Sequence, residues 1–500
     1  MQNDRYIAAA DLGSSKLALS VARVEGDDVQ IIYYKETPSD GIRYSCVFNP
    51  KRAALPLKAA IKDAEEELGI KILQIVVGLP RYELRQDVAN AKIQRSDPGS
   101  CITMEEINAI KNQAVDDYSL YDESNEEIYG AIAQSFSADD LVRASEEDVV
   151  GTSSDELEGH FKIYIGARKA IGNIDRMLND AGIAPALKLF VPSTVAKAVL
   201  SDGDKDNGVA LVELGAGVSS LTIYTGKILR HYSSIPFGGK SITSDIKYEC
   251  GFTDSLAENI KLAFGSCIPD KLLTLSEKVI QINDDEDGSY QHLPVRYLSE
   301  IIGCRTREII SAILYQIQES GYADKLRNGI VLTGGGANLV NIANLFKEMS
   351  GYNVRIGYPR SRNIITEGCN GIGETSAVAS IGMILEAARY PHLNCIEENP
   401  EAAVNTRAEK PADTAAAETG APAAAAPAAT PADTVANVTG ELFDVQPGEV
   451  IVPHKKDKGE KKQRKSLFNW TKVGQKLENT LSGIEKTFDG TVGDLFDTME

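Results

Sequence analysis

Two distant segments each place a carboxylate directly before a turn of small residues. Asp11 follows the apolar run 7–10 and precedes Gly13, Ser14, Ser15 and Lys16, while Glu213 follows the apolar run 209–212 and precedes Gly215, Gly217 and Ser219. Glycine allows close approach of the backbone to an anion, free N–H groups hold phosphate oxygens, and a carboxylate binds hydrated Mg²⁺. One glycine-rich turn is usually only a turn. Two copies favour a clamp that holds a nucleoside triphosphate from both sides.

Alternating apolar residues return after each turn, so both segments are predicted to be β-hairpins. A third cluster, Gly334, Gly335 and Gly336, follows a buried-strand pattern at 329–333 and precedes a helical pattern. The start of a helix beside flexible backbone is suited to an anion or a nucleotide. We therefore expect this cluster to form part of the same site.

Composition excludes several classes of protein. The formal net charge of −20 argues against nucleic acid as the main partner. The seven cysteines include no Cys-x-x-Cys pair and the five histidines show no metal-ligand spacing, which is typical of a reducing compartment. No signal peptide and no apolar run of about 20 residues is evident. These features predict a cytosolic protein, unless another segment attaches it to a surface.

Residues 1 to about 390 alternate strand and helix patterns, which indicates an α/β fold. A capping box at Thr103 and Glu106 predicts a helix to about Tyr118, and the acidic segment 145–148 is interpreted as a solvated loop. The other expected helices span 52–68, 170–181, 240–265 and 295–322, with one more starting at Ser193; the other expected strands span 72–77, 128–136, 160–165 and 187–191.

The remainder of the chain has a different composition. Ala, Pro, Thr and Glu dominate 402–435, so 389–454 is predicted to be a disordered linker. A strongly basic stretch starts at Lys455, and an apolar stripe at helical spacing follows: Leu467, Phe468, Trp470, Val473, Leu477, Leu481, Ile484 and Phe488. Such a helix either packs back on the globular body or lies in a membrane interface. The basic lead-in and the long linker favour anionic lipid.

The order of these parts resembles the phosphate and adenosine motifs of the actin/Hsp70/sugar-kinase superfamily. The insert and the tail narrow the resemblance to the FtsA family of bacterial cell-division proteins. It implies an actin-like two-lobed ATPase fold of duplicated RNase H-like domains, with an inserted subdomain, a linker and a terminal amphipathic helix. The implied parts are a first half-domain (1–80 and 169–207), an insert (81–168), a second half-domain (208–246 and 327–388), a smaller subdomain (247–326), the linker (389–454) and the membrane-targeting segment (455–500).

The resemblance also implies roles for the motif residues. Asp11 would hold the water shell of Mg²⁺, Glu213 would assist from the other side, and the two turns would bind the β- and γ-phosphates of ATP. The segment 257–261 is similar to the family's Ala-Glu-x-x-Lys helix, so Glu258 would contact the ribose and Lys261 the base. Gly334 to Gly336 would contact the α-phosphate and adenosine.

Two departures from the superfamily pattern concern hydrolysis. Glu213 replaces the usual Asp, and Val191 stands before Pro192 where a Glu that polarises water is common. Binding of ATP is therefore expected, while its hydrolysis is in doubt, since phosphoryl transfer depends on positioning and electrostatics.

The resulting hypothesis is a peripheral protein on the cytoplasmic face of the inner membrane at the division site, which self-associates and tethers the tubulin-like protein FtsZ. The alternatives are an actin-like scaffold of pilus or secretion assembly and a small-molecule kinase of the same superfamily. An Hsp70-type chaperone is disfavoured because no substrate-binding β-domain follows the core.

Overall fold

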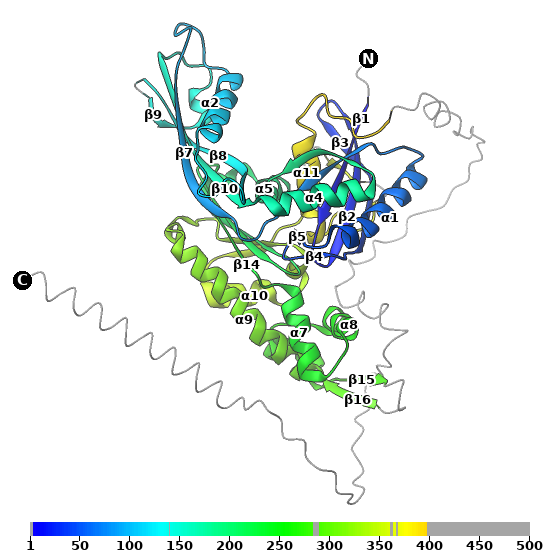
Figure 1. Ribbon diagram of the computed structural model, residues 1–500. Coiled ribbons are helices and arrows are strands. Elements are labelled where there is room, and N and C mark those ends of the chain that lie inside the picture. Colours follow the sequence, from blue (N-terminus) through cyan, green and yellow to red (C-terminus); the bar gives the residue numbers. More distant parts are fainter. Residues whose placement is uncertain (1–3, 140, 284–289, 361–363, 367–368, 398–500) are drawn as a thin grey trace, which may run out of the picture. The chain divides into compact units, whose positions relative to one another are not determined.

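The computed structural model describes residues 4–397 except 140, 284–289, 361–363 and 367–368, and Figure 1 shows it as a ribbon. Its framework includes two mixed β-sheets with a common strand order. The first has the order β11-β6-β1-β2-β3-β19 and the second β14-β13-β12-β17-β18. In each sheet, three strands that are consecutive in the sequence pair in antiparallel fashion (β1-β2-β3 and β12-β13-β14). Two later strands then add in parallel on the other side of the first strand (β6 and β11 beside β1, β17 and β18 beside β12). The repeat in the sequence is therefore also a repeat in topology.

The first sheet is buried on both faces. Residues 7–10 of its central strand are all fully buried, as expected for a sheet covered by helices on both sides. Its strands are β1 (Arg5–Leu12), β2 (Lys16–Glu25), β3 (Asp28–Pro38), β6 (Gln74–Gly78), β11 (Ala184–Leu189) and β19 (Ile364–Ile365), and the helices in its core are α1 (Pro50–Leu68), α4 (Arg168–Ala181), α5 (Val191–Val199) and α11 (Val378–Ala387). Asn49 caps α1 and Gly69 ends it in the left-handed conformation.

The second sheet carries its own group of helices. Its strands are β12 (Val209–Leu214), β13 (Ser219–Thr225), β14 (Ile228–Ile235), β17 (Ile330–Thr333) and β18 (Val354–Ile356), and its helices are α7 (Gly239–Cys250), α8 (Asp254–Phe264), α9 (Val295–Glu319) and α10 (Ile342–Ser350). The smaller elements nearby are α6 (Asp202–Asn207), the hairpin β15 (Val279–Asn283) and β16 (Tyr290–Pro294), and the 3₁₀ turns η1 (Pro269–Lys271), η2 (Leu273–Glu277), η3 (Ala323–Lys325), η4 (Gly335–Asn338) and η5 (Thr375–Ala377).

The two faces of β12 belong to different cores. Ala210 and Val212 are buried in the core beneath the second group of helices, whereas Val209 and Leu211 are buried in the core of the first sheet. The alternation of side chains along a strand places these pairs on opposite faces. The second sheet is therefore packed on both sides, once by its own helices and once by the first half of the molecule.

A four-stranded antiparallel sheet with the order β7-β10-β8-β9 lies between β6 and α4 in the sequence. Its elements are β7 (Arg85–Gln94), β8 (Glu126–Ala138), β9 (Leu141–Ala144), β10 (Glu156–Ala167), α2 (Met104–Asp116) and α3 (Glu146–Val149), and the short pair β4 (Ile42–Arg43) and β5 (Cys46–Val47) completes the assigned strands of the described residues. In Figure 1 this sheet and α2 extend away from α1 and α4.

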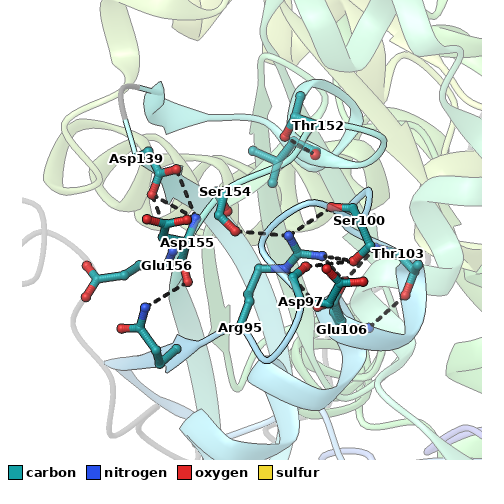
Figure 2. Close-up of polar contacts among 12 residues, drawn as sticks. Arg95, Asp97, Ser100, Thr103, Glu106, Asp139, Thr152, Ser154, Asp155 and Glu156 are labelled. Carbon is teal, nitrogen blue, oxygen red and sulfur yellow. Dashed lines mark hydrogen bonds and ion pairs between the residues drawn. The ribbon is translucent and has the colours of Figure 1, made fainter.

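Arg95, directly after β7, fixes the loop that leads into α2 (Figure 2). Its guanidinium donates to both carboxylate oxygens of Glu106 (2.9 and 3.1 Å), to the main-chain oxygens of Ser100 and Ser154 (3.0 Å each) and to Ser100 Oγ (3.1 Å). The Arg95 side chain is only 1% exposed. A buried guanidinium is tolerated here because its N–H groups all have partners.

Most predicted elements are confirmed, including both hairpins and the capping box at Thr103. The interpretation of one segment of the insert was wrong. The acidic segment 145–148 is not a loop but contains the short helix α3, because Ser145 and Asp148 form a second capping box. The predicted helix at 240–265 is divided into α7 and α8 where Gly251 adopts a positive φ of 73°. Strands β3, β7, β9 and β14 and the shorter strands β4, β5, β15, β16, β18 and β19 were not predicted.

The first residues of the expected linker pack against the first sheet. Cys395 is fully buried, its N–H donates to the Tyr6 carbonyl (2.7 Å), and its own carbonyl accepts from the N–H of Leu73 (2.9 Å). The rest of the expected linker, the basic stretch and the predicted membrane helix lie outside the described residues. Within the described ranges, no helix has the length and apolar character needed to cross a membrane.

Candidate functional site

The three glycine turns meet around one cavity of about 310 Å³. All of the residues that the sequence predicts for nucleotide binding line it: Asp11, Gly13, Ser14, Ser15, Lys16, Glu213, Gly215, Gly217, Ser219, Glu258, Lys261, Gly334, Gly335 and Gly336. They come from the ends of β1, β12 and β17 and from α8. A cavity of this size that gathers loop backbone at strand ends is typical of a ligand site.

The turns of the two hairpins touch each other. A Cβ atom on Gly217 would lie 2.8 Å from Ser14 Oγ, closer than real Cβ contacts come, and 3.0 Å from Ser14 Cβ, which is tighter than most. Ser14 is itself held in place, since its Oγ accepts from the N–H of Ser45 (3.0 Å) and its carbonyl accepts from Lys240 Nζ (2.6 Å). The predicted clamp is therefore closed at its tips, and a side chain at 217 would push the two turns apart.

Arg81 lies between the two carboxylates of the clamp. Its Nη2 donates to Asp11 Oδ1 at 2.6 Å, its Nη1 donates to Glu213 Oε1, and all three residues are largely buried. Burial raises the pKa of Asp11, and the charge of Arg81 opposes this rise. Burial alone would lower the pKa of Arg81, but Glu213 and Asp11 raise it, so the guanidinium stays charged.

This arrangement differs from the predicted one, in which Asp11 and Glu213 hold Mg²⁺ and its water. One oxygen of each carboxylate is already used by Arg81. Among the described residues, no three acidic, His or Cys side chains lie together in a way that could hold a metal ion. The residues as they stand fit a carboxylate–guanidinium–carboxylate bridge rather than a metal site, and a divalent ion would have to compete with Arg81 for the same oxygens.

Glu258 and Lys261 pair with each other on α8. Lys261 Nζ lies 2.7 Å from Glu258 Oε2 and also donates to Thr243 Oγ1 (2.8 Å) and to the Gly239 carbonyl (3.1 Å). Thr243 Oγ1 in turn donates to Glu258. The network fixes both predicted side chains at the cavity wall, but their assignment to ribose and base stays a prediction.

The third glycine cluster forms a turn rather than the start of an α-helix. Gly334 has a φ of 83°, and η4 (Gly335–Asn338) follows it, while α10 begins only at Ile342. The Gly334 carbonyl accepts from Thr375 Oγ1 (2.9 Å), and its N–H donates to the Thr375 carbonyl (3.2 Å). The expected helix N-terminus is therefore replaced by a tight backbone turn, with nothing within 4 Å of a Cβ built at Gly335.

Val191 is the first residue of α5 and lies in the core of the first sheet. It is 1% exposed and touches Gly78, where an added Cβ would lie 2.4 Å from Val191 Cγ2. It does not line the cavity described above. An apolar, buried side chain at this position has no group with which to polarise a water molecule.

Sequence reasoning missed two basic residues of the site, Arg81 and Lys240. Arg81 follows the end of β6, which is parallel to β1, so both strands end at one edge and a charge after β6 lies near Asp11. Lys240 directly follows Gly238 and Gly239; partial desolvation lowers its pKa, an effect that Glu258 opposes. The available signal for Arg81 was therefore its position just after a strand that is parallel to β1.

Two sheets of one topology, joined by facing hairpins around a cavity, define an actin-like fold. A chain of the "PilM-PilN type IV pilus biogenesis complex" has the same fold, with a TM-score of 0.53, 14% identity and coverage of 76% of this chain and 97% of that chain. At this identity the likeness concerns the fold alone.

The sequence comparisons all concern one family of proteins. The sequence model of the family described as "Cell division protein FtsA" matches residues 210–381. Proteins named "Cell division protein FtsA" from Neisseria meningitidis and Borreliella burgdorferi are 27% and 28% identical over 363 and 388 residues, covering 72% and 77% of this chain and 85% and 91% of those proteins. The resemblance to FtsA is thereby confirmed, and the chain has an actin-like fold.

Proposed function

We propose that this protein binds ATP in the cavity between its two hairpins, self-associates, and tethers an FtsZ-like division protein to the cytoplasmic membrane through its C-terminal helix. The observation that carries the nucleotide assignment is the convergence of all three glycine turns and four basic side chains on one cavity. Backbone N–H groups at such turns are suited to phosphate oxygens. Because the two hairpins come from different sheets, a bound nucleotide would set the angle between the halves and so bias assembly.

The tail assignment rests on the sequence of 455–500. A helix with one apolar face and a polybasic lead-in binds anionic lipid reversibly, and many copies on one polymer bind far more strongly than one. Attachment at the inner face of the membrane and recruitment of FtsZ are part of the same proposal. The pilus-scaffold alternative has only the fold likeness in its favour.

The nucleotide proposal is tested at Gly335. Its surroundings are open, so Gly335→Asp and Gly335→Asn are both accommodated and differ only in charge. We expect Gly335→Asp to weaken binding of a fluorescent ATP analogue about tenfold or more by repelling phosphate, and Gly335→Asn to change it much less. The measurement is fluorescence anisotropy with the full chain. Equal affinities of the two variants, or no binding by the parent, would contradict the proposal.

The membrane proposal is tested by sedimentation with anionic vesicles, comparing the full chain with a chain that ends at His454, each with and without ATP. The full chain should pellet and the shortened chain should remain in the supernatant. Leu477→Glu places a charge on the apolar stripe and should reduce pelleting, whereas Gln475→Glu adds the same charge off the stripe. If the shortened chain pellets as well as the full chain, the anchor lies elsewhere.

A further inference from the structure

We propose that Arg81 is the resident cation of this site: it holds Asp11 and Glu213 together in place of a divalent metal ion, so that the folded site and its ligand binding do not require Mg²⁺. The claim about nucleotide binding rests on the proposed function, whereas the claim about the folded site without nucleotide does not.

The Arg81 guanidinium lies between the carboxylates of Asp11 and Glu213, where a bound cation would lie. Asp11 ends β1 of the first sheet, Glu213 ends β12 of the second, and the two amino groups of one guanidinium each reach one carboxylate. The Arg81 side chain is 9% exposed and each acidic side chain 15%. Two partly desolvated carboxylates that face each other repel strongly unless a cation lies between them. The arginine is therefore the group that allows the two hairpins to close.

The charges of the cavity agree with this role. Four acidic side chains (Asp11, Glu36, Glu213 and Glu258) and four basic ones (Lys16, Arg81, Lys240 and Lys261) line it, so their formal charges cancel. Lys16 pairs with Glu36 (2.5 Å), Lys261 pairs with Glu258 (2.7 Å), and Lys240 Nζ donates to the Ser14 carbonyl (2.6 Å), which leaves Arg81 as the partner of Asp11 and Glu213. Without the guanidinium, two carboxylates would face the incoming phosphates, and only an added cation would relieve the repulsion.

The main chain of Arg81 is also held in place by neighbouring residues. Its carbonyl accepts a hydrogen bond from the buried hydroxyl of Tyr232 on β14. The backbone of Tyr232 is bound on both sides by the amide of Gln86, which donates to its carbonyl (2.6 Å) and accepts from its N–H (3.1 Å). The Tyr232 ring packs edge-on against Tyr164 and Phe190. The arginine is thus positioned by the second sheet and by the inserted sheet together.

The first test uses Mg²⁺ alone, without nucleotide. We expect millimolar MgCl₂, compared with EDTA at matched ionic strength, to leave the Tm of the parent within about 1 °C and to raise that of Arg81→Gln by about 3 °C or more. The matched control is the double variant Arg81→Gln/Glu213→Gln, which removes one positive and one negative charge and should lose the response. A parent that gains as much from Mg²⁺ as Arg81→Gln overturns the inference.

The second test measures affinity for a fluorescent ATP analogue in Mg²⁺ and in EDTA. The parent should change by less than about threefold and Arg81→Gln should lose about tenfold or more in EDTA, while Arg81→Lys should keep most of the parent's independence. A parent that loses tenfold in EDTA overturns the inference even if Arg81→Gln does not fold. A parent that binds no nucleotide in either buffer contradicts the proposed function, and the inference is then decided by the Tm measurement.

Discussion

The contact between the tips of the hairpins makes Gly217→Ala the sharpest test of the clamp. The added methyl group would lie 2.8 Å from Ser14 Oγ and 3.0 Å from Ser14 Cβ. Ser14 is 5% exposed and is tied to Ser45 and Lys240 by hydrogen bonds, so it has little freedom to move away. The methyl group must therefore separate the two turns by a few tenths of an ångström.

The size of the effect follows from two opposing contributions. Overpacking a closed contact costs about 1–3 kcal/mol, and replacing a glycine of ordinary backbone conformation with alanine returns about 0.4–1 kcal/mol through the unfolded chain. The net loss is about 1–2 kcal/mol, which corresponds to a fall in Tm of a few degrees. If ATP binds only the closed clamp, the same loss weakens its binding about five- to thirtyfold.

The assay is thermal unfolding of the full chain together with nucleotide anisotropy. Gly335→Ala is the matched control, because it lies in the same cavity with nothing within 4 Å of its added Cβ. It should unfold at or slightly above the temperature of the parent. Ser14→Gly in the Gly217→Ala background removes both clashing atoms and should recover part of the lost Tm. If Gly217→Ala is as stable as Gly335→Ala, the hairpins do not touch as described.

Three further predictions concern other parts of the protein. Arg95→Gln should destabilise the full chain by about 2 kcal/mol, measured by urea unfolding, because it removes hydrogen bonds to a charged partner and leaves main-chain acceptors unpaired; unchanged stability would contradict the described network. Hydrogen bonds from Arg95 lower the pKa of Glu106 below its usual 4.5, so this pair contributes its full stabilisation above pH 4.5. The Tm difference between the parent and Arg95→Gln should therefore narrow as the pH falls below that value. A constant Tm difference would show that Glu106 is not the partner. Burial raises the pKa of Cys395 to about 11, so at pH 8 iodoacetamide should modify the exposed Cys101 well before Cys395, as read by peptide mass spectrometry, and early modification of Cys395 would show that residues near 395 do not pack on the first sheet.

The sequence was informative where local chemistry decides the structure. The hairpins at Asp11 and Glu213 combine apolar strands with small-residue turns, and the capping box at Thr103 specifies its own helix start. Their convergence on one cavity was anticipated only through the repeat and the family resemblance. The assignments that depend on bound ligand, such as Glu258 to the ribose, stay predictions.

The missed features depend on contacts between distant residues. Strand β14 was overlooked because its pattern of buried and half-buried residues is irregular, and its pairing partner β13 had to be known first. In the sequence, Arg81 is a single basic residue after a predicted strand, and no local motif indicates its role. Only the approach of Glu213 from the second sheet shows that it bridges two acids. Residues near Cys395 look like linker by composition and are ordered by pairing with residues near the start of the chain.

Because β12 is packed on both of its faces, we expect the two halves of the protein to unfold together. Leu211 and Val212 are neighbours in the chain but are buried in different cores, so neither half can lose its core without exposing a face of this strand. Amide protons of residues 210–213 should therefore exchange with solvent only when the whole globular part unfolds. A duplicated protein could in principle melt in two steps, yet this shared strand couples the halves into one cooperative transition.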